Sequence, residues 1–62
     1  MNVVRKYRKK NKISLQKLAL KSQIHINTLW RYEKYRVIPS LETLKKISNA
    51  TKIDLETLID GE

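Results

Sequence analysis

Two polar side chains four residues apart, Asn27 and Arg31, have the chemistry needed to recognise the edge of a nucleic-acid base. An asparagine amide can form two hydrogen bonds with adenine, and an arginine guanidinium can form two with O6 and N7 of guanine. Residues four apart share one face of a helix, so the pair acts together if the segment is helical. With Leu29 turned toward a core, Asn27, Arg31 and Lys34 lie farthest from that core, and Trp30 lies on the flank.

The charge of the chain is concentrated in its first part. Residues 1–36 hold eleven Lys and Arg and one acid, Glu33, whereas residues 37–62 hold three Lys and five Asp and Glu. The net charge is +8 and the sequence pI is near 10.1. A positive excess of this size attracts a polyanion, so we interpret the first part of the chain as a surface that faces phosphates.

Composition excludes several other functions. The chain has 62 residues, no cysteine and one histidine, so the sequence predicts no disulfide, no metal site and no cofactor. It contains no set of nucleophile, base and orienting residue, so we expect no enzymatic activity and no small-molecule ligand. No run of about 18 apolar residues is present, and residues 1–10 do not resemble a secretory signal. We therefore expect a cytoplasmic protein with no membrane contact.

Five short helices are needed to place these side chains, because apolar residues recur three and four apart along the whole chain. We predict helices from about Asn2 to Lys10, from Ser14 to about Lys21 and from Ile26 to about Lys34. Ser40 and Asp54 are expected to cap the last two helices, with Pro39 just before the fourth, and His25 to cap the third. The residues predicted to face the core are Val4, Tyr7, Leu15, Leu18, Ala19, Leu29, Tyr32, Leu41, Leu44 and Ile47, and the last helix carries Leu55, Leu58 and Ile59.

The second and third predicted helices are joined by only three or four residues. Ala19 is small enough to let two crossing helices approach closely, and Ile24 and Leu29 can fill the angle between them. This pattern is typical of a helix-turn-helix, here over about residues 14–34, in which the second helix enters the DNA major groove while the first crosses the backbone. The short connection thus predicts a basic helical domain that binds nucleic acid.

Motifs spread over residues 3–59 fall in register with one family. These motifs are Tyr7-Arg8, Ile13-Ser14, Leu18-Ala19, Ile24, Leu29, Arg31-Tyr-Glu33, Pro39-Ser-Leu-Glu-Thr-Leu44 and Ile53-Asp-Leu-Glu-Thr-Leu58. The chain resembles the Xre/Cro/C1 helix-turn-helix family of phage and bacterial repressors. The resemblance implies an all-α, compact five-helix domain of the lambda-repressor type over residues 1–62. It also implies a dimer that binds double-stranded DNA at a palindromic operator.

The resemblance further implies roles for individual residues. Arg8, late in the first helix, should pair with Glu33 at the end of the third, and Ile26 matches a position that reaches into the groove, where it can touch a thymine methyl group. The base-reading set that we expect is Ile26, Asn27, Trp30 and Arg31. The start of the second helix can bind phosphate through its free amides. The phosphate-binding set that we expect is Arg8, Lys9, Ser14, Leu15, Gln16, His25, Thr28, Lys34 and Arg36.

The sequence departs from the family at four loop positions. Where the family often has glycine or another residue that tolerates the left-handed conformation, this chain has Lys12, Gln23, Tyr35 and Lys52. A residue other than glycine in that conformation costs on the order of 1 kcal/mol. Either the loops are rebuilt or the domain is less stable than its relatives.

Two functions remain as alternatives at this point. The first is a sequence-specific transcriptional regulator, a repressor that reads the major groove with the third helix. The second is an antitoxin-type module that binds a toxin and also binds DNA, although no extra segment supplies a toxin-binding surface. A cationic membrane-surface peptide is disfavoured by the capped helices. Because Leu55, Leu58 and Ile59 cannot all be buried in so thin a core, we expect a weak homodimer.

Overall fold

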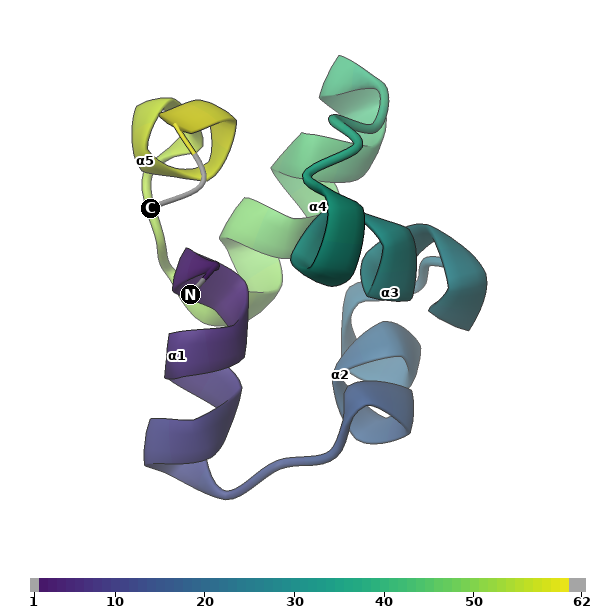
Figure 1. Cartoon of the computed structure of the whole chain (residues 1–62), viewed down its shortest axis with the longest axis vertical. Helices are drawn as coiled ribbons and strands as arrows, with labels where there is room; N and C mark the ends of the chain where they lie inside the picture. Colours follow the sequence, from purple (N-terminus) through teal and green to yellow (C-terminus); the bar gives the residue numbers. More distant parts are fainter. Residues whose placement is uncertain (1, 61–62) are drawn as a thin grey trace.

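The computed structural model describes residues 2–60, and these residues form five helices and no strand. The helices are α1 (Val3–Asn11), α2 (Leu15–Ser22), α3 (Ile26–Tyr35), α4 (Leu41–Thr51) and α5 (Leu55–Asp60), joined by short connections (Figure 1). α2 packs against α3 and α4, and α1 packs against α3 and α5. The predicted all-α, five-helix fold is therefore confirmed, and α3 is held from two sides while part of its surface stays free.

Side-chain caps define where four of the helices begin. The hydroxyls of Ser14 and Ser40 accept hydrogen bonds from the amides of Lys17 (3.0 Å) and Thr43 (3.2 Å), as expected for N-caps. Nδ1 of His25 accepts a hydrogen bond from the Asn27 amide at 3.1 Å, so the predicted histidine cap is confirmed. The cap of α1 is less obvious in the sequence, because Asn2, which we expected to be the first helical residue, is the cap itself.

The same side chain of Asn2 also connects two helices. Its Oδ1 accepts from the Val4 amide at 2.7 Å, and its Nδ2 donates to the backbone carbonyl of Tyr32 at 3.4 Å. Asn2 is only 5% exposed. A polar group buried to this extent must have its hydrogen bonds satisfied, and here the partners tie the start of α1 to the C-terminal half of α3.

The four left-handed residues end four of the helices. They are Lys12, Gln23, Arg36 and Lys52, with φ between 56° and 64°. The prediction is correct for Lys12, Gln23 and Lys52 and wrong for Tyr35, because α3 continues through Tyr35 and the left-handed residue is Arg36. The loops are not rebuilt, so the cost of about 1 kcal/mol for each non-glycine residue applies to this fold.

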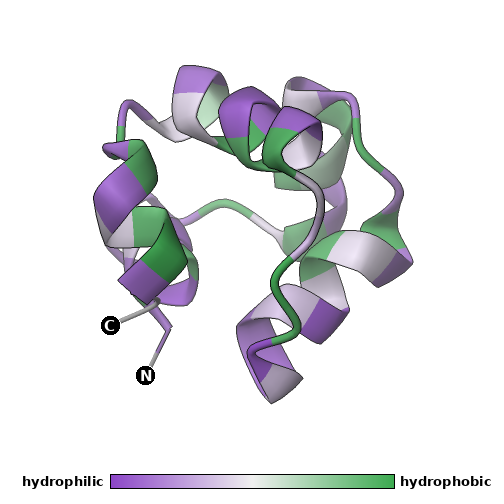
Figure 2. Cartoon of the chain, turned by 90° about the horizontal axis from the view of Figure 1, so that it is seen from above, coloured by the Kyte–Doolittle hydropathy of each residue, from purple (hydrophilic) through white to green (hydrophobic). Residues whose placement is uncertain are grey.

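The core lies where the apolar faces of the helices meet (Figure 2). Its buried members are Val4, Leu18, Ala19, Leu29, Tyr32, Leu44, Ile47 and Leu58. Leu41 was expected to face inward, and this is wrong, because it is 56% exposed, whereas the 50% exposure of Ile59 agrees with the expectation that Leu55, Leu58 and Ile59 cannot all be buried. Leu41 is the first residue of α4 and Ile59 is near the end of α5, so both lie at the ends of their helices.

Tyr32 is the largest of the fully buried residues. Its hydroxyl donates a hydrogen bond to the backbone carbonyl of Leu58, which joins α3 to α5. Burial raises the pKa of the Tyr32 phenol, because the charged phenolate would lose its hydration inside the core. The inward side of α3 is thereby fixed by packing and by a hydrogen bond.

Candidate nucleic-acid interface

The turn between α2 and α3 is held by backbone hydrogen bonds. The Ile24 amide donates to the carbonyl of Ala19 at 3.1 Å, across the left-handed residue Gln23. Ala19 is 4% exposed, which agrees with its predicted place at the crossing of the two helices. Only Gln23, Ile24 and His25 separate the two helices. The predicted helix-turn-helix is therefore present, and its turn fixes how α3 is presented.

The outward face of α3 carries the predicted reading residues. Leu29 and Tyr32 are completely buried, whereas Asn27, Arg31 and Lys34 are exposed. Because the buried side of the helix is fixed, Asn27 and Arg31 are held on its opposite, free side. Within residues 2–60 the side chains of Asn27 and Arg31 take no part in an ion pair. Both side chains are therefore available to an incoming ligand.

Two apolar side chains flank this polar pair. Ile26, on the first turn of α3, is 39% exposed, so it neither packs fully into the core nor stands free. Trp30 is 41% exposed, and its ring meets that of Tyr35 edge to face, with the centroids 5.4 Å apart. The Nζ of Lys34 lies 5.3 Å from the centre of the Trp30 ring. The indole therefore has a defined position on the flank, between a cation and a second aromatic ring.

The residues expected at phosphates come from α1, α2 and α3 and from the three connections that follow these helices. At the start of α2, Ser14 and Gln16 are exposed and Leu15 is half-buried. The Ser14 hydroxyl takes up the Lys17 amide, so the amides of Leu15 and Gln16 remain as donors at the positive end of the helix dipole. The exposed cations of the set are Lys9, Lys34 and Arg36, and the remaining members are Arg8 and Thr28, both half-buried, and His25, exposed.

Arg8 and Glu33 form the expected ion pair between α1 and α3. Nε of Arg8 donates to Oε2 of Glu33 and Nη2 to Oε1, both at 2.8 Å, and Nη1 donates to the carbonyl of Ile13 at 3.2 Å. The side chains are 17% and 6% exposed. The hydrogen bonds to Glu33 raise the pKa of the Arg8 guanidinium above its usual value. A guanidinium has five N–H groups, so Arg8 keeps donors for a further anion.

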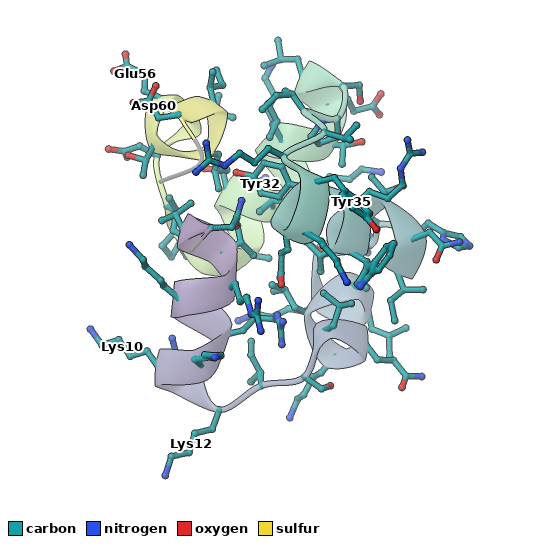
Figure 3. The ribbon with its side chains drawn as sticks, in the orientation of Figure 1. Lys10, Lys12, Tyr32, Tyr35, Glu56 and Asp60 are labelled. Carbon is teal, nitrogen blue, oxygen red and sulfur yellow. The ribbon has the colours of Figure 1, made fainter. Side chains whose placement is uncertain are left out.

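Charge is separated in space as well as in sequence. Lys10 and Lys12, at the end of α1, point away from the lower end of the molecule, and Glu56 and Asp60 lie on α5 at its upper end (Figure 3). The first four helical segments of the chain hold most of the cations, while α5 carries acids. The resulting field orients the basic side of the molecule toward a polyanion.

A comparison with known protein families fits this geometry. A sequence profile of the family described as helix-turn-helix, of the Cro/C1 type, matches residues 4–58. This chain belongs to the helix-turn-helix family. No curated protein and no solved structure matches it significantly. As a helix-turn-helix protein it is a DNA-binding regulator, with double-stranded DNA as its partner.

Among residues 2–60, this helix-turn-helix protein has no helix long and apolar enough to cross a membrane.

Sequence reasoning missed two residues at the interface. Asn2 was interpreted as a helical residue and Arg5 only as part of the general positive charge, yet both line a hollow between α1 and α3. The signal that could have found Asn2 is its residue type, because asparagine before a helix is a strong N-cap.

Proposed function

We propose that this protein is a transcriptional repressor that recognises one DNA sequence by inserting α3 into the major groove. The observation that carries the proposal is the pair Asn27 and Arg31. Both are exposed on the side of α3 opposite the fully buried Leu29 and Tyr32. Asparagine and arginine are the side chains best suited to adenine and guanine edges, and each such two-pronged contact discriminates by about 1–3 kcal/mol.

The flanking residues complete the reading surface. Ile26 lies one residue before Asn27 and offers its exposed apolar surface to a thymine methyl group. Around this centre, we assign contacts with phosphates to a set that fixes the register of the protein on the duplex and carries no sequence information. The set is Arg8, Lys9, Ser14, Leu15, Gln16, His25, Thr28, Lys34 and Arg36.

We further propose that two copies bind a palindromic operator as a weak homodimer. Apolar side chains outside the reading set are exposed on α5 (Ile59) and on the segment from α3 into α4 (Val37, Ile38 and Leu41). Burial of this surface between two copies would add the affinity that one small reading helix lacks. A two-fold axis then places the half-sites about 34 Å apart on one face of the duplex.

Selection of bound sequences from a random DNA pool tests the proposal. We expect the recovered sequences to share a short motif, repeated in inverted orientation with centres about one helical turn apart. Binding of the purified protein to the recovered duplex should exceed binding to a scrambled duplex by about 10³-fold or more at physiological salt. Recovery of unrelated sequences, bound no better than the pool, would show that the protein does not read sequence.

A further inference from the structure

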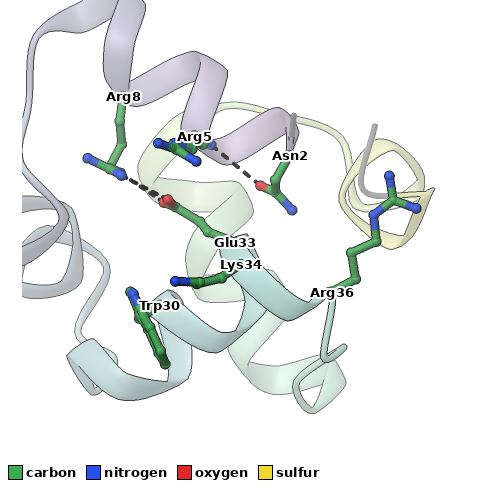
Figure 4. A pocket seen from close by; sticks show the side chains of 7 residues that line it. All are labelled: Asn2, Arg5, Arg8, Trp30, Glu33, Lys34 and Arg36. Carbon is green, nitrogen blue, oxygen red and sulfur yellow. Dashed lines mark hydrogen bonds and ion pairs between the residues drawn. The ribbon is translucent and has the colours of Figure 1, made fainter.

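A groove between α2 and α4 lies outside the surface assigned to DNA. The cavity between α1 and α3 borders the reading face (Figure 4), whereas this groove, of about 270 Å³, lies between the C-terminal end of α2 and the C-terminal half of α4. We call it the α2–α4 groove, and its lining residues are Lys21, Ser22, Gln23, Lys46, Asn49 and Ala50. We propose that the α2–α4 groove binds an acidic segment of a partner protein. The inference goes beyond the proposed function, because no lining residue belongs to the base-reading or phosphate-binding set.

The lining of the groove is positively charged and rich in hydrogen-bond donors. Lys21 comes from α2 and Lys46 from α4, so each wall supplies one ammonium group, and the lining contains no carboxylate. The side-chain amides of Gln23 and Asn49 add further N–H donors. Within residues 2–60 neither lysine takes part in an ion pair, although Lys46 is half-buried. A ligand that suits this lining carries negative charge and accepts hydrogen bonds, as a carboxylate does.

Backbone groups, rather than the two lysines, close the helix ends beside the groove. At the end of α2, the Ile24 amide donates to the carbonyl of Ala19 at 3.1 Å. At the end of α4, the Lys52 amide donates to the carbonyl of Ser48 at 2.7 Å. Because these carbonyls already have partners, the lysine side chains are not needed to satisfy them. The ammonium groups of the groove are therefore available to a ligand.

An exposed apolar side chain next to the lining indicates which class of ligand fits. Leu20 precedes Lys21 on α2 and, at 74% exposed, is the most exposed large hydrophobic residue among residues 2–60. An acidic protein segment can cover Leu20 with an apolar side chain and place carboxylates at the lysines, whereas a simple anion leaves Leu20 in water. The groove is also smaller than a typical small-molecule pocket of about 300–1,000 Å³. Both features favour a protein segment that lies across the surface.

The groove and the reading face are built from different residues. Asn27 and Arg31 on α3 do not line the groove, and α4, which forms one of its walls, supplies no residue to the DNA-contact sets. A partner in the groove thus leaves the base-reading side chains uncovered. The chain can then hold DNA and an acidic partner at the same time, which would bring that partner to the operator.

A helical peptide of about 15 residues tests the inference. It carries two glutamates one turn apart with a leucine beside them, and the control peptide has glutamine in place of both glutamates. In nitrogen-15 NMR spectra of the protein at low salt, the acidic peptide should shift the amide signals of residues 20–23 and 46–50. We expect a Kd of about 1 mM, since each surface ion pair contributes little. The glutamine peptide should leave these signals in place. Equal shifts with both peptides, or none with the acidic one, would overturn the inference.

Substitutions separate the groove from a general attraction to a basic protein. Lys21→Gln and Lys46→Gln should each weaken peptide binding about two- to fivefold, and Leu20→Ser should weaken it about fivefold. Lys10→Gln, which removes an exposed lysine at the end of α1, should leave binding unchanged. Circular dichroism should show that all four variants fold, because these positions are exposed or half-buried. If Lys10→Gln weakens binding as much as Lys46→Gln does, the attraction is general and the groove is not a specific site.

An exchange of charges provides the strictest control. Combining Lys21→Glu with Lys46→Glu lowers the net charge from +8 to +4, because each exchange removes two positive charges from the balance. The whole protein stays positive and should still repel a basic peptide. A peptide with lysine in place of its two glutamates should nevertheless bind this variant and not the unaltered protein. Failure of the exchanged pair to bind would contradict recognition at the groove.

Two other occupants of the groove have signatures of their own. If a second copy of the chain fills it, dilution of the protein alone should shift the signals of residues 20–23 and 46–50. If DNA fills it, a DNA duplex should displace the acidic peptide. Either result would overturn the assignment to an acidic partner and leave sequence reading by α3 untouched. We expect neither, and we expect the affinity for the selected duplex to be the same with and without the peptide.

Discussion

Removal of the Arg8 guanidinium should destabilise the fold more than removal of any other single surface charge. Arg8→Met keeps the aliphatic stem but leaves the Glu33 carboxylate, which is 6% exposed, without its two 2.8 Å donors. Breaking a fully buried pair costs about 3–5 kcal/mol. Because Arg8 is 17% exposed and water can partly replace it, we expect roughly 2–3 kcal/mol. A fold of this length has only about 3–9 kcal/mol of stability in total.

Urea denaturation followed by circular dichroism measures this loss. Arg8→Met should lower the free energy of unfolding by roughly 2–3 kcal/mol and the melting temperature by roughly 10–20 °C. Lys9→Met, which removes a neighbouring exposed cation, should stay within about 0.5 kcal/mol. Replacing both Arg8 and Glu33 by Met should recover most of the loss, since no buried charge is then left alone. A cost below about 0.5 kcal/mol for Arg8→Met alone would refute the reasoning.

Three further outcomes follow from the same structure. The logarithm of the DNA-binding constant should fall linearly with the logarithm of salt concentration, by about 0.9 for each phosphate neutralised, and a flat response would contradict DNA binding by this basic surface. Lys52→Gly should stabilise the fold by about 0.5–1 kcal/mol, because Lys52 has a left-handed φ of 64°. The control Lys45→Gly, inside α4, should cost about 1 kcal/mol. Equal effects of the two substitutions in thermal melts would exclude backbone strain at Lys52. The pKa of the Tyr32 phenol is raised in the folded chain, so above pH about 10 the unfolded chain loses this proton while the folded chain keeps it. The stability that the phenol contributes below that pH is therefore lost as the pH rises through the folded pKa. Tyr32→Phe should lose stability less steeply in that range, and parallel curves would show that burial of the phenol does not matter.

The elements of this fold were predictable where a local signal and the apolar pattern agree. Ser14 and Ser40 begin helices in the sequence and in the structure, and Leu18, Leu29 and Leu58 are buried as their spacing indicates. The ends of α1, α2, α3 and α4 were less predictable, because no glycine marks them. α3 runs one residue farther than expected, where the ring of Tyr35 packs against Trp30, and Arg36 takes the left-handed conformation instead.

The candidate site was predictable only as far as helical periodicity reaches. The exposure of Asn27 and Arg31 follows from the burial of Leu29, and the Arg8–Glu33 pair from the family resemblance. The cavity beside them depends on how α1 crosses α3, and no spacing within either helix encodes that arrangement. Arg5 and Trp30 are 25 positions apart in the sequence, so only the tertiary structure brings them to one hollow.

Binding of Arg31→Ala to a panel of single-base variants of the selected duplex tests the central claim most directly. Arg31 is exposed on the free side of α3 and is assigned to one purine edge. The substitution should therefore cost roughly 1–3 kcal/mol on the best sequence and remove the preference at one base position. Arg36→Ala should instead weaken all members of the panel alike and lower the salt slope by about one unit. If Arg31→Ala weakens every duplex equally and leaves each base preference intact, α3 does not read the sequence.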